Sequence, residues 1–149
     1  INTSSGAGLQ GSIGQSNYAA AKGGIASLTL VQAAELGRYG VTANALAPAA
    51  RTAMTEGAMP DMVKKPDDDS FDAWAAENVA PLVVWLGSEA SGHVSGQLFE
   101  SQGGRISLGD GWRTGVTRDK GARWQVAEVG EAVAAILSEA PKAQKVWGT

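Results

Sequence analysis

The sequence has 149 residues, of which 44% are hydrophobic and 18% are charged, and these values predict one globular domain with a core rather than a disordered chain. The net charge is −3 and the Lys and Arg residues are scattered, so we expect a small-molecule partner and neither nucleic acid nor a membrane. Cysteine is absent, which excludes disulfides and thiolate metal sites and favours a cytoplasmic location.

Three elements are predicted in the first third of the chain. Residues 1–3 look extended and run directly into a Ser-Ser-Gly turn. Residues 17–38 predict a helix, because they are rich in alanine, carry apolar residues at helical spacing and end at glycines. Residues 41–47 combine β-branched and small residues with almost no charge, as in a strand covered on both faces, and Pro48 ends that strand.

The next segment, residues 49–76, is polar and contains two prolines and an acidic run, so we expect a flap with short helical pieces. Residues 77–88 and 126–140 each predict a helix, and residues 97–101 predict a strand. The two helices each gather apolar residues on one face, namely Val79, Leu82, Val83 and Leu86 in the first and Val129, Val133, Ile136 and Leu137 in the second.

The order of these elements predicts the fold class. Strands that alternate with helices predict an α/β fold in which helices cover a parallel sheet. About three strands make a thin sheet for a complete doubly wound domain. We therefore expect the C-terminal part of a doubly wound parallel-sheet domain, with further sequence upstream of Ile1.

Residues 6–11, Gly-Ala-Gly-Leu-Gln-Gly, match the G-x-G-x-x-G pattern of dinucleotide-binding loops. That function needs a hydrophobic strand before the glycines, a helix that opens on them and an acid about 20 residues later. Here polar residues precede the motif, residues 12–16 disfavour the first turns of a helix, and the next acid, Glu35, falls inside the predicted helix. We expect instead a loop that lines a substrate pocket.

The strongest chemical signal is the pair Tyr18 and Lys22, four residues apart on one face of the predicted helix. An ammonium group one helical turn away favours the phenolate, so this phenol is suited to taking a proton from an alcohol while hydride leaves the carbon. Ser5, at the end of a strand, is placed to hydrogen-bond the reacting oxygen. By itself the spacing Y-x-x-x-K also fits an ordinary exposed Tyr-Lys pair.

In combination, the motifs resemble one enzyme family. The chain is similar to the second half of a short-chain dehydrogenase/reductase over residues 1 to about 105, in the stretches I-N-T-S-S-G-A-G, N-Y-A-A-A-K, V-T-A-N-A-L-A-P and S-G-Q-L-F-E-S-Q-G-G. Residues 47–56 and 77–86 and the tail 104–112 are similar to (3R)-hydroxyacyl-CoA dehydrogenase parts of multifunctional enzymes and to bacterial hydroxysteroid dehydrogenases.

This resemblance implies a Rossmann domain, with residues 1–149 as its catalytic C-terminal half and residues 104–149 as an extension. It implies NAD or NADP as cofactor, a 3-hydroxyacyl-CoA or steroid-like substrate, and a homodimer or tetramer. Ser5 would orient the substrate, Tyr18 would act as acid and base, and Lys22 would also bind the nicotinamide ribose. Pro48, Ala49 and Thr52 would flank the nicotinamide.

Two departures from the family pattern matter for these expectations. The glycine-rich nucleotide loop, the residue that selects the cofactor and the active-site asparagine all belong upstream of this chain, so we expect the fragment alone to be inactive. The family's usual Pro-Gly is Pro48-Ala49 here, and a methyl group is a small intrusion unless positive φ is required.

Other candidate sites have plainer interpretations. His93 is the single histidine, so a histidine-based zinc site or a Ser-His-Asp hydrolase would have to rest on this one residue in a Ser-Gly-rich turn. Residues 67–72 lack the glycine and glutamate of a calcium loop, so no metal is expected. Trp85 and Trp112 could line a substrate wall or anchor the core. A second hypothesis makes the chain a truncated fragment that acts as an oligomerisation module through the helix face from Ala19 to Ala34 and the long C-terminal tail. NADH binding by the chain alone would contradict it.

Overall fold

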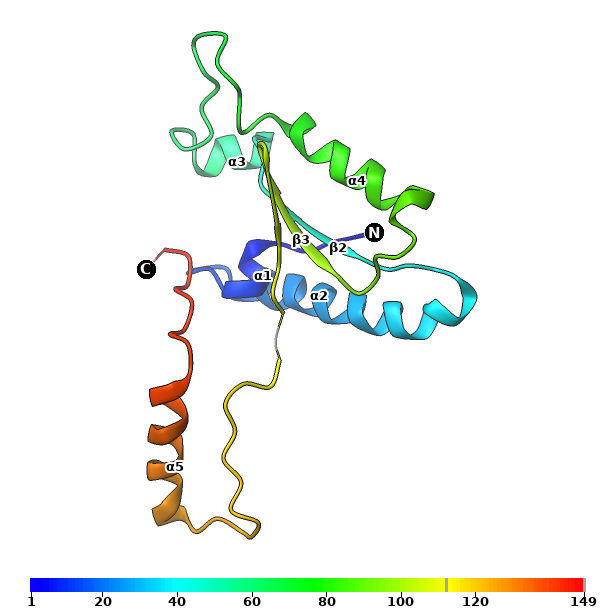
Figure 1. The fold of residues 1–149 in the computed structure, drawn as a ribbon. Coiled ribbons are helices and arrows are strands. Elements are labelled where there is room, and N and C mark those ends of the chain that lie inside the picture. Colours follow the sequence, from blue (N-terminus) through cyan, green and yellow to red (C-terminus); the bar gives the residue numbers. More distant parts are fainter. Residues whose placement is uncertain (112, 149) are drawn as a thin grey trace. The chain divides into compact units, whose positions relative to one another are not determined.

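The computed structural model describes residues 1–111 and 113–148 and divides into two compact units (Figure 1). Unit 1 comprises Ile1–Asp110 and Val146–Thr149, and unit 2 comprises Gly111–Lys145. Unit 1 holds the sheet and every residue proposed for chemistry. Trp112, one of the two tryptophans considered for a substrate wall, lies outside the described residues.

Unit 1 is built on a sheet in the order β1-β2-β3-β4. β1 (Asn2–Thr3), β2 (Ala45–Pro48) and β3 (Leu98–Gln102) are parallel, and β4 (Arg105–Leu108) is antiparallel to β3. The parallel α/β sheet is therefore confirmed. β2 begins later than the predicted strand 41–47 and includes Pro48, which pairs with Ser101 and was expected to end the strand. Just before β2, the Asn44 side chain donates to the Val94 carbonyl and accepts from the Gln97 amide.

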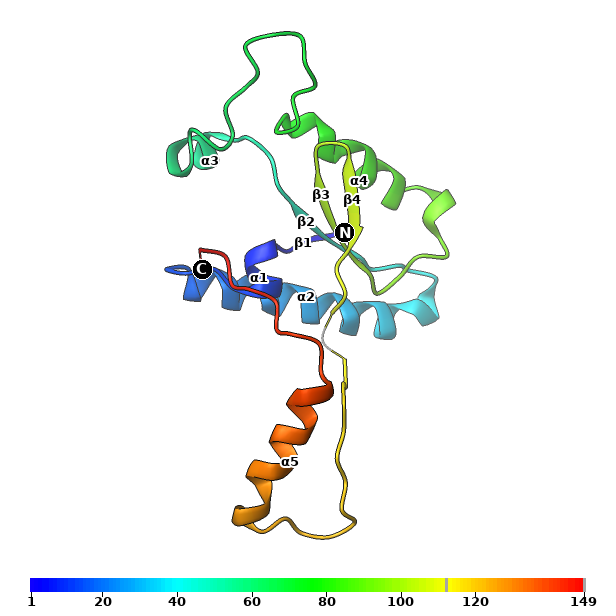
Figure 2. The same ribbon diagram turned by 60° about the vertical axis from the view of Figure 1, so that its left-hand side comes forward.

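Helices cover both faces of this sheet (Figures 1 and 2). α2 (Ser16–Leu36) lies on one face, where the Asn2 side chain donates to Thr29 Oγ1 at 3.0 Å. α4 (Ala80–Leu86) lies on the other, where Leu82 and Leu86 are buried against Leu46 of β2. The face predicted for this helix is confirmed, since Val79 and Val83 also pack against that cluster.

The observed helices differ from the predicted ones at their ends. α2 stops at Leu36 and a 3₁₀ turn, Gly37–Tyr39, completes the predicted segment 17–38. A 3₁₀ turn over Ala76–Val79 precedes α4, and another over Glu89–Ser91 follows it. The flap segment, residues 49–76, contains α3 (Ala53–Ala58) as its helical piece.

Two elements of unit 1 were not predicted. Residues 6–11 were expected to form a loop, but Gly6–Gln10 form a short helix, α1. That prediction was wrong because it judged the residues by propensity, whereas Ser5 caps the helix and α2 packs against it. β4 follows from the two-residue turn Gly103-Gly104, in which Gly103 has a φ of 55°, a backbone conformation that tight hairpins require.

Unit 2 contains α5 (Val126–Glu139), close to the predicted helix 126–140. Val129, Val133 and Ile136 of this helix line a hollow of about 150 Å³ together with Arg118, Trp124 and Ala132. Leu137, the fourth residue of the predicted apolar face, is exposed and does not line this hollow. Across the residues that the structure describes, no helix has both the length and the apolar character needed to cross a membrane.

Candidate active site

Ser5 lies at the point where β1 ends and α1 begins. Its backbone is extended, and its Oγ accepts a hydrogen bond from the Ala7 amide at 3.2 Å, which makes Ser5 the N-cap of α1. This contact uses one lone pair of the oxygen. The hydroxyl proton of Ser5 therefore stays available to donate to a substrate oxygen.

Lys22 connects this strand end with Tyr18. Its Nζ donates to the Thr3 carbonyl, two residues before Ser5, at 2.8 Å. The same Nζ lies 5.7 Å from the centre of the Tyr18 ring, one turn earlier on α2. The lysine thus contacts both the segment that carries Ser5 and the ring that carries the phenol.

Two residues behind the site pack against α2, namely Ser4 after β1 and Gly8 within α1, and the sequence analysis missed the role of both. Ser4 is buried, and its Oγ donates to the Lys22 carbonyl at 2.8 Å. Gly8 leaves no room for a side chain, because a Cβ there would lie 2.6 Å from both the Lys22 carbonyl carbon and the Gly23 nitrogen. The available signal in the sequence was the glycine at position 8, but its role could be understood from its contact with Lys22 and Gly23 in the folded chain.

The functional groups remain accessible from outside. Tyr18 is 41% exposed, and Ser5 and Lys22 are half-buried. The structure brings Lys22 to Tyr18 and to the strand end before Ser5. That all three act on one substrate stays a prediction.

β2 ends at Pro48, and Ala49 and Thr52 follow it. Because β1 and β2 are parallel, this end lies at the same edge of the sheet as Ser5. The Ala49 amide donates to the Ser101 carbonyl at 2.9 Å, and no described non-glycine residue, Ala49 included, has positive φ. The alanine methyl is therefore accommodated without the strain that its place after Pro48 could have caused.

Thr52 already has a structural role. Its Oγ1 accepts from the Thr55 amide at 3.3 Å and caps α3, the first helical piece of the flap. Its side chain is exposed. A role beside the nicotinamide remains a prediction for Pro48, Ala49 and Thr52.

The flap segment is fastened by Arg51. Its guanidinium pairs with the Asp72 carboxylate and donates to the Val63 carbonyl at 2.9 Å, so three points of the flap meet at one side chain. The hydrogen bond from Arg51 lowers the pKa of Asp72 below its ordinary value of 3.8, and the same bond raises the pKa of Arg51.

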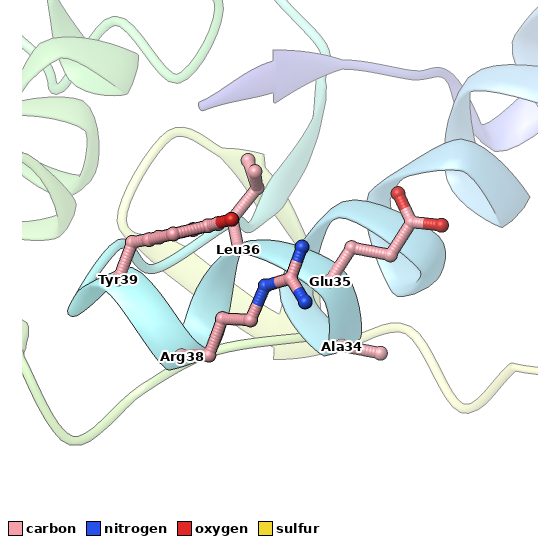
Figure 3. A pocket seen from close by; sticks show the side chains of 5 residues that line it. All are labelled: Ala34, Glu35, Leu36, Arg38 and Tyr39. Atoms are coloured by element: carbon pink, nitrogen blue, oxygen red, sulfur yellow. The ribbon is translucent and has the colours of Figure 1, made fainter.

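A hollow on unit 1 lies away from these residues. Its volume is about 440 Å³, and all of its lining residues come from the end of α2 and the turn that follows, namely Ala34, Glu35, Leu36, Arg38 and Tyr39 (Figure 3). Sixteen residues of helix separate Tyr18 from Ala34, a distance of about 24 Å. This hollow therefore does not take part in chemistry at Tyr18.

Trp85 is the other tryptophan considered for a substrate wall. It lies on α4, and its ring contacts the His93 ring edge-on, with 6.3 Å between the centres. α4, which carries Trp85, covers the face of the sheet opposite α2, which carries Tyr18 (Figures 1 and 2). The residues that the structure describes hold no group of three acidic or histidine side chains that could bind a metal ion.

Comparison with known proteins gives the family. The model of the family described as enoyl-(acyl carrier protein) reductase matches residues 1–105. The chain is 49% identical over 111 residues to the hydroxyacyl-CoA dehydrogenase ChsB1 of Mycobacterium tuberculosis, covering 72% of this chain and 34% of that protein. It is 41% identical over 112 residues to the (3R)-3-hydroxyacyl-CoA dehydrogenase of Rattus norvegicus, covering 70% and 41% of the two chains.

A solved structure supports the same assignment. The crystal structure of a short chain dehydrogenase from Mycobacterium avium superposes with a TM-score of 0.84 and 54% identity, over 100% of this chain and 46% of that one. The chain thus spans less than half the length of each of these three proteins. The predicted fold class, part of a doubly wound parallel-sheet domain, is confirmed, and the chain belongs to the short-chain dehydrogenase/reductase family.

Proposed function

We propose that this chain is the catalytic C-terminal half of an NAD(P)-dependent oxidoreductase that interconverts a secondary alcohol and a ketone. The observation that carries the proposal is the position of Lys22 Nζ, which is 2.8 Å from the Thr3 carbonyl beside Ser5 and 5.7 Å from the Tyr18 ring centre. Tyr18, Lys22 and Ser5 are the three residues to which we assign the transfer of the alcohol proton.

Each residue has a distinct role in the proposed reaction. The Tyr18 phenolate takes the proton from the alcohol oxygen, and in the reverse direction the phenol returns it. The Lys22 ammonium stabilises the phenolate by its positive charge. The Ser5 hydroxyl, fixed as a helix cap, donates to the substrate oxygen and orients it. NAD or NADP, when bound, supplies or accepts the hydride.

The chain's own residues fit part of such a cofactor. Lys22 is half-buried, and its recorded acceptor is one backbone carbonyl, so the ammonium has further donors for ribose hydroxyls. Pro48 and Ala49 lie at the sheet edge shared with Ser5, where a nicotinamide would bind, and Thr52 follows them. We propose that the pyrophosphate-binding glycine loop belongs to an N-terminal half of the same protein.

The substrate that we propose is a 3-hydroxyacyl-CoA, ahead of a steroid. Its support is the names of the relatives from M. tuberculosis and R. norvegicus, both hydroxyacyl-CoA dehydrogenases. We also propose a homodimer or tetramer, because Leu28, Leu30 and Val31 of α2 are about half exposed. A cytoplasmic location belongs to the same proposal, and the absence of cysteine supports it.

The decisive test is Tyr18→Phe in the longest natural chain that contains this sequence. We expect the turnover of a 3-hydroxyacyl-CoA with NAD or NADP to fall at least about a hundredfold, since general acid and base catalysis contributes 10² to 10⁴. Tyr39→Phe is the matched control, because Tyr39 is an exposed tyrosine just beyond the far end of α2. Turnover of the Tyr18 variant at the level of the control would end the proposal.

A further inference from the structure

The segment Val146–Gly148, here called the strap, pairs with the connection between α1 and α2. Ser12 and Trp147 form a parallel bridge. The Ile13 amide donates to the Trp147 carbonyl at 3.1 Å, and the Trp147 amide donates to the Gly11 carbonyl at 3.3 Å. Both the strap and residues 1–110 belong to unit 1, so this pairing is part of one compact body.

The side chain of Trp147 reaches the residue next to Ser5. A Cβ added at Gly6 would lie 2.9 Å from Cζ2 and 3.0 Å from Cη2 of the Trp147 ring. Only glycine therefore fits at this position while the ring stays in place. The indole lies against the first residue of α1, immediately after the proposed substrate-orienting serine.

Trp147 is connected to both parts of the candidate site, the part that carries Ser5 and the part that carries Tyr18. The strap pairs with residues 11–13, which lead to α2 and Tyr18, while the ring contacts the helix that Ser5 caps. Trp147 is still 48% exposed, so a large apolar surface remains open beside these elements. A half-exposed indole held by its backbone can add contact area with an apolar ligand at low entropic cost.

We propose that Trp147 is a specificity-determining residue, which forms a wall against the apolar chain of the substrate and so favours longer substrates. The proposal rests on the proposed function at Ser5, Tyr18 and Lys22. Trp147 lies outside residues 1–105, the part that the family model matches, so the wall would be a feature added to the shared catalytic half.

The test compares a short and a long substrate in the longest natural chain that contains this sequence. With Trp147→Ala we expect kcat/KM for 3-hydroxydecanoyl-CoA to fall about tenfold or more, and that for 3-hydroxybutyryl-CoA to change less than about twofold, because only the long chain reaches the indole. Trp147→Phe should keep most of the preference. Trp85→Ala, at a partly exposed tryptophan on α4 of the same unit, is the control and should leave the preference unchanged.

A second variant tests the contact itself. Gly6→Ala should displace the ring and reduce the preference for the long chain, and it should add nothing further when Trp147 is already alanine. Faster amide exchange at Ile13 in Trp147→Ala would show that the indole anchors the strap, independently of turnover.

The outcomes separate this proposal from the proposed function. An unchanged preference, or an equal loss for both substrates, would overturn the wall while Tyr18→Phe still abolished turnover. Full turnover by Tyr18→Phe would overturn the catalytic assignment instead. A wild-type enzyme that turned over neither substrate would overturn both, and the wild-type assay alone would show it.

Discussion

The α1–α2 junction and the flap segment flank the candidate site, and they are held in opposite ways. At the junction, Gly8 meets the backbone of Lys22 and Gly23 with no space for a methyl group, and buried Ser4 bonds to the Lys22 carbonyl. In the flap, most side chains are exposed, and the pair Arg51 and Asp72 is its main side-chain connection.

This difference separates two requirements of an enzyme. Proton transfer needs fixed distances, and close backbone packing fixes Lys22 more strictly than an ion pair could. A substrate needs a way in, and an exposed segment held by a few polar contacts opens at lower cost. The comparison predicts that damage to the junction affects stability and chemistry together, whereas damage to the flap acts locally.

The largest effect is expected from Gly8→Ala at the junction. The new Cβ would lie 2.6 Å from backbone atoms that cannot rotate away, so we expect a loss of about 3 kcal/mol in the free energy of unfolding. Urea denaturation measures it. Gly24→Ala is the matched control, because nothing lies within 4 Å of its added Cβ, and it should stabilise α2 by about 0.5–1 kcal/mol. Equal effects of the two variants would remove the distinction between junction and surface.

A smaller effect is expected from Ser4→Ala. The variant leaves the Lys22 carbonyl without its buried donor, which costs about 1–2 kcal/mol of stability. It should also loosen Lys22, so turnover should fall more than stability alone explains. Ser27→Ala, at an exposed serine on the same helix, should change neither quantity. A Ser4 variant with wild-type stability would contradict the role given to this hydrogen bond.

The smallest effect is expected in the flap, where acid should weaken the pair of Arg51 and Asp72. The pKa of Asp72 is lowered in the folded chain, so the pair stabilises the flap above the ordinary value of 3.8 and this contribution is lost as the pH falls through the lowered pKa. The protection of the Trp74 amide, which donates to Asp72 at 3.1 Å, should therefore drop in that range. Asp72→Asn should show the weaker protection already at pH 7, and global unfolding in the same range would mean that the flap does not act locally.

Particular elements show how far the sequence could be interpreted. The helix at 17–38 was predicted from its long run of helix-forming residues, and the face of α4 was predicted from the helical spacing of its apolar residues. α1 was missed because five residues with three small side chains carry no periodic signal, and its stability comes from the Ser5 cap and from α2. The hairpin at Gly103-Gly104 had a recognisable turn, but the four residues of β4 are too short to predict from alternation.

The sequence by itself determined the family and the α/β class, and it supplied the residues that we propose for the chemistry, because these follow from motifs and from spacing along one helix. Only the tertiary structure decided why the glycines are there. The backbone of α2 leaves no room for a side chain at position 8, and the ring of Trp147 leaves none at position 6. These contacts join residues that are 14 and 141 positions apart in the chain. Close packing between distant segments leaves no periodic signal in the sequence, so it could be found only in the folded chain.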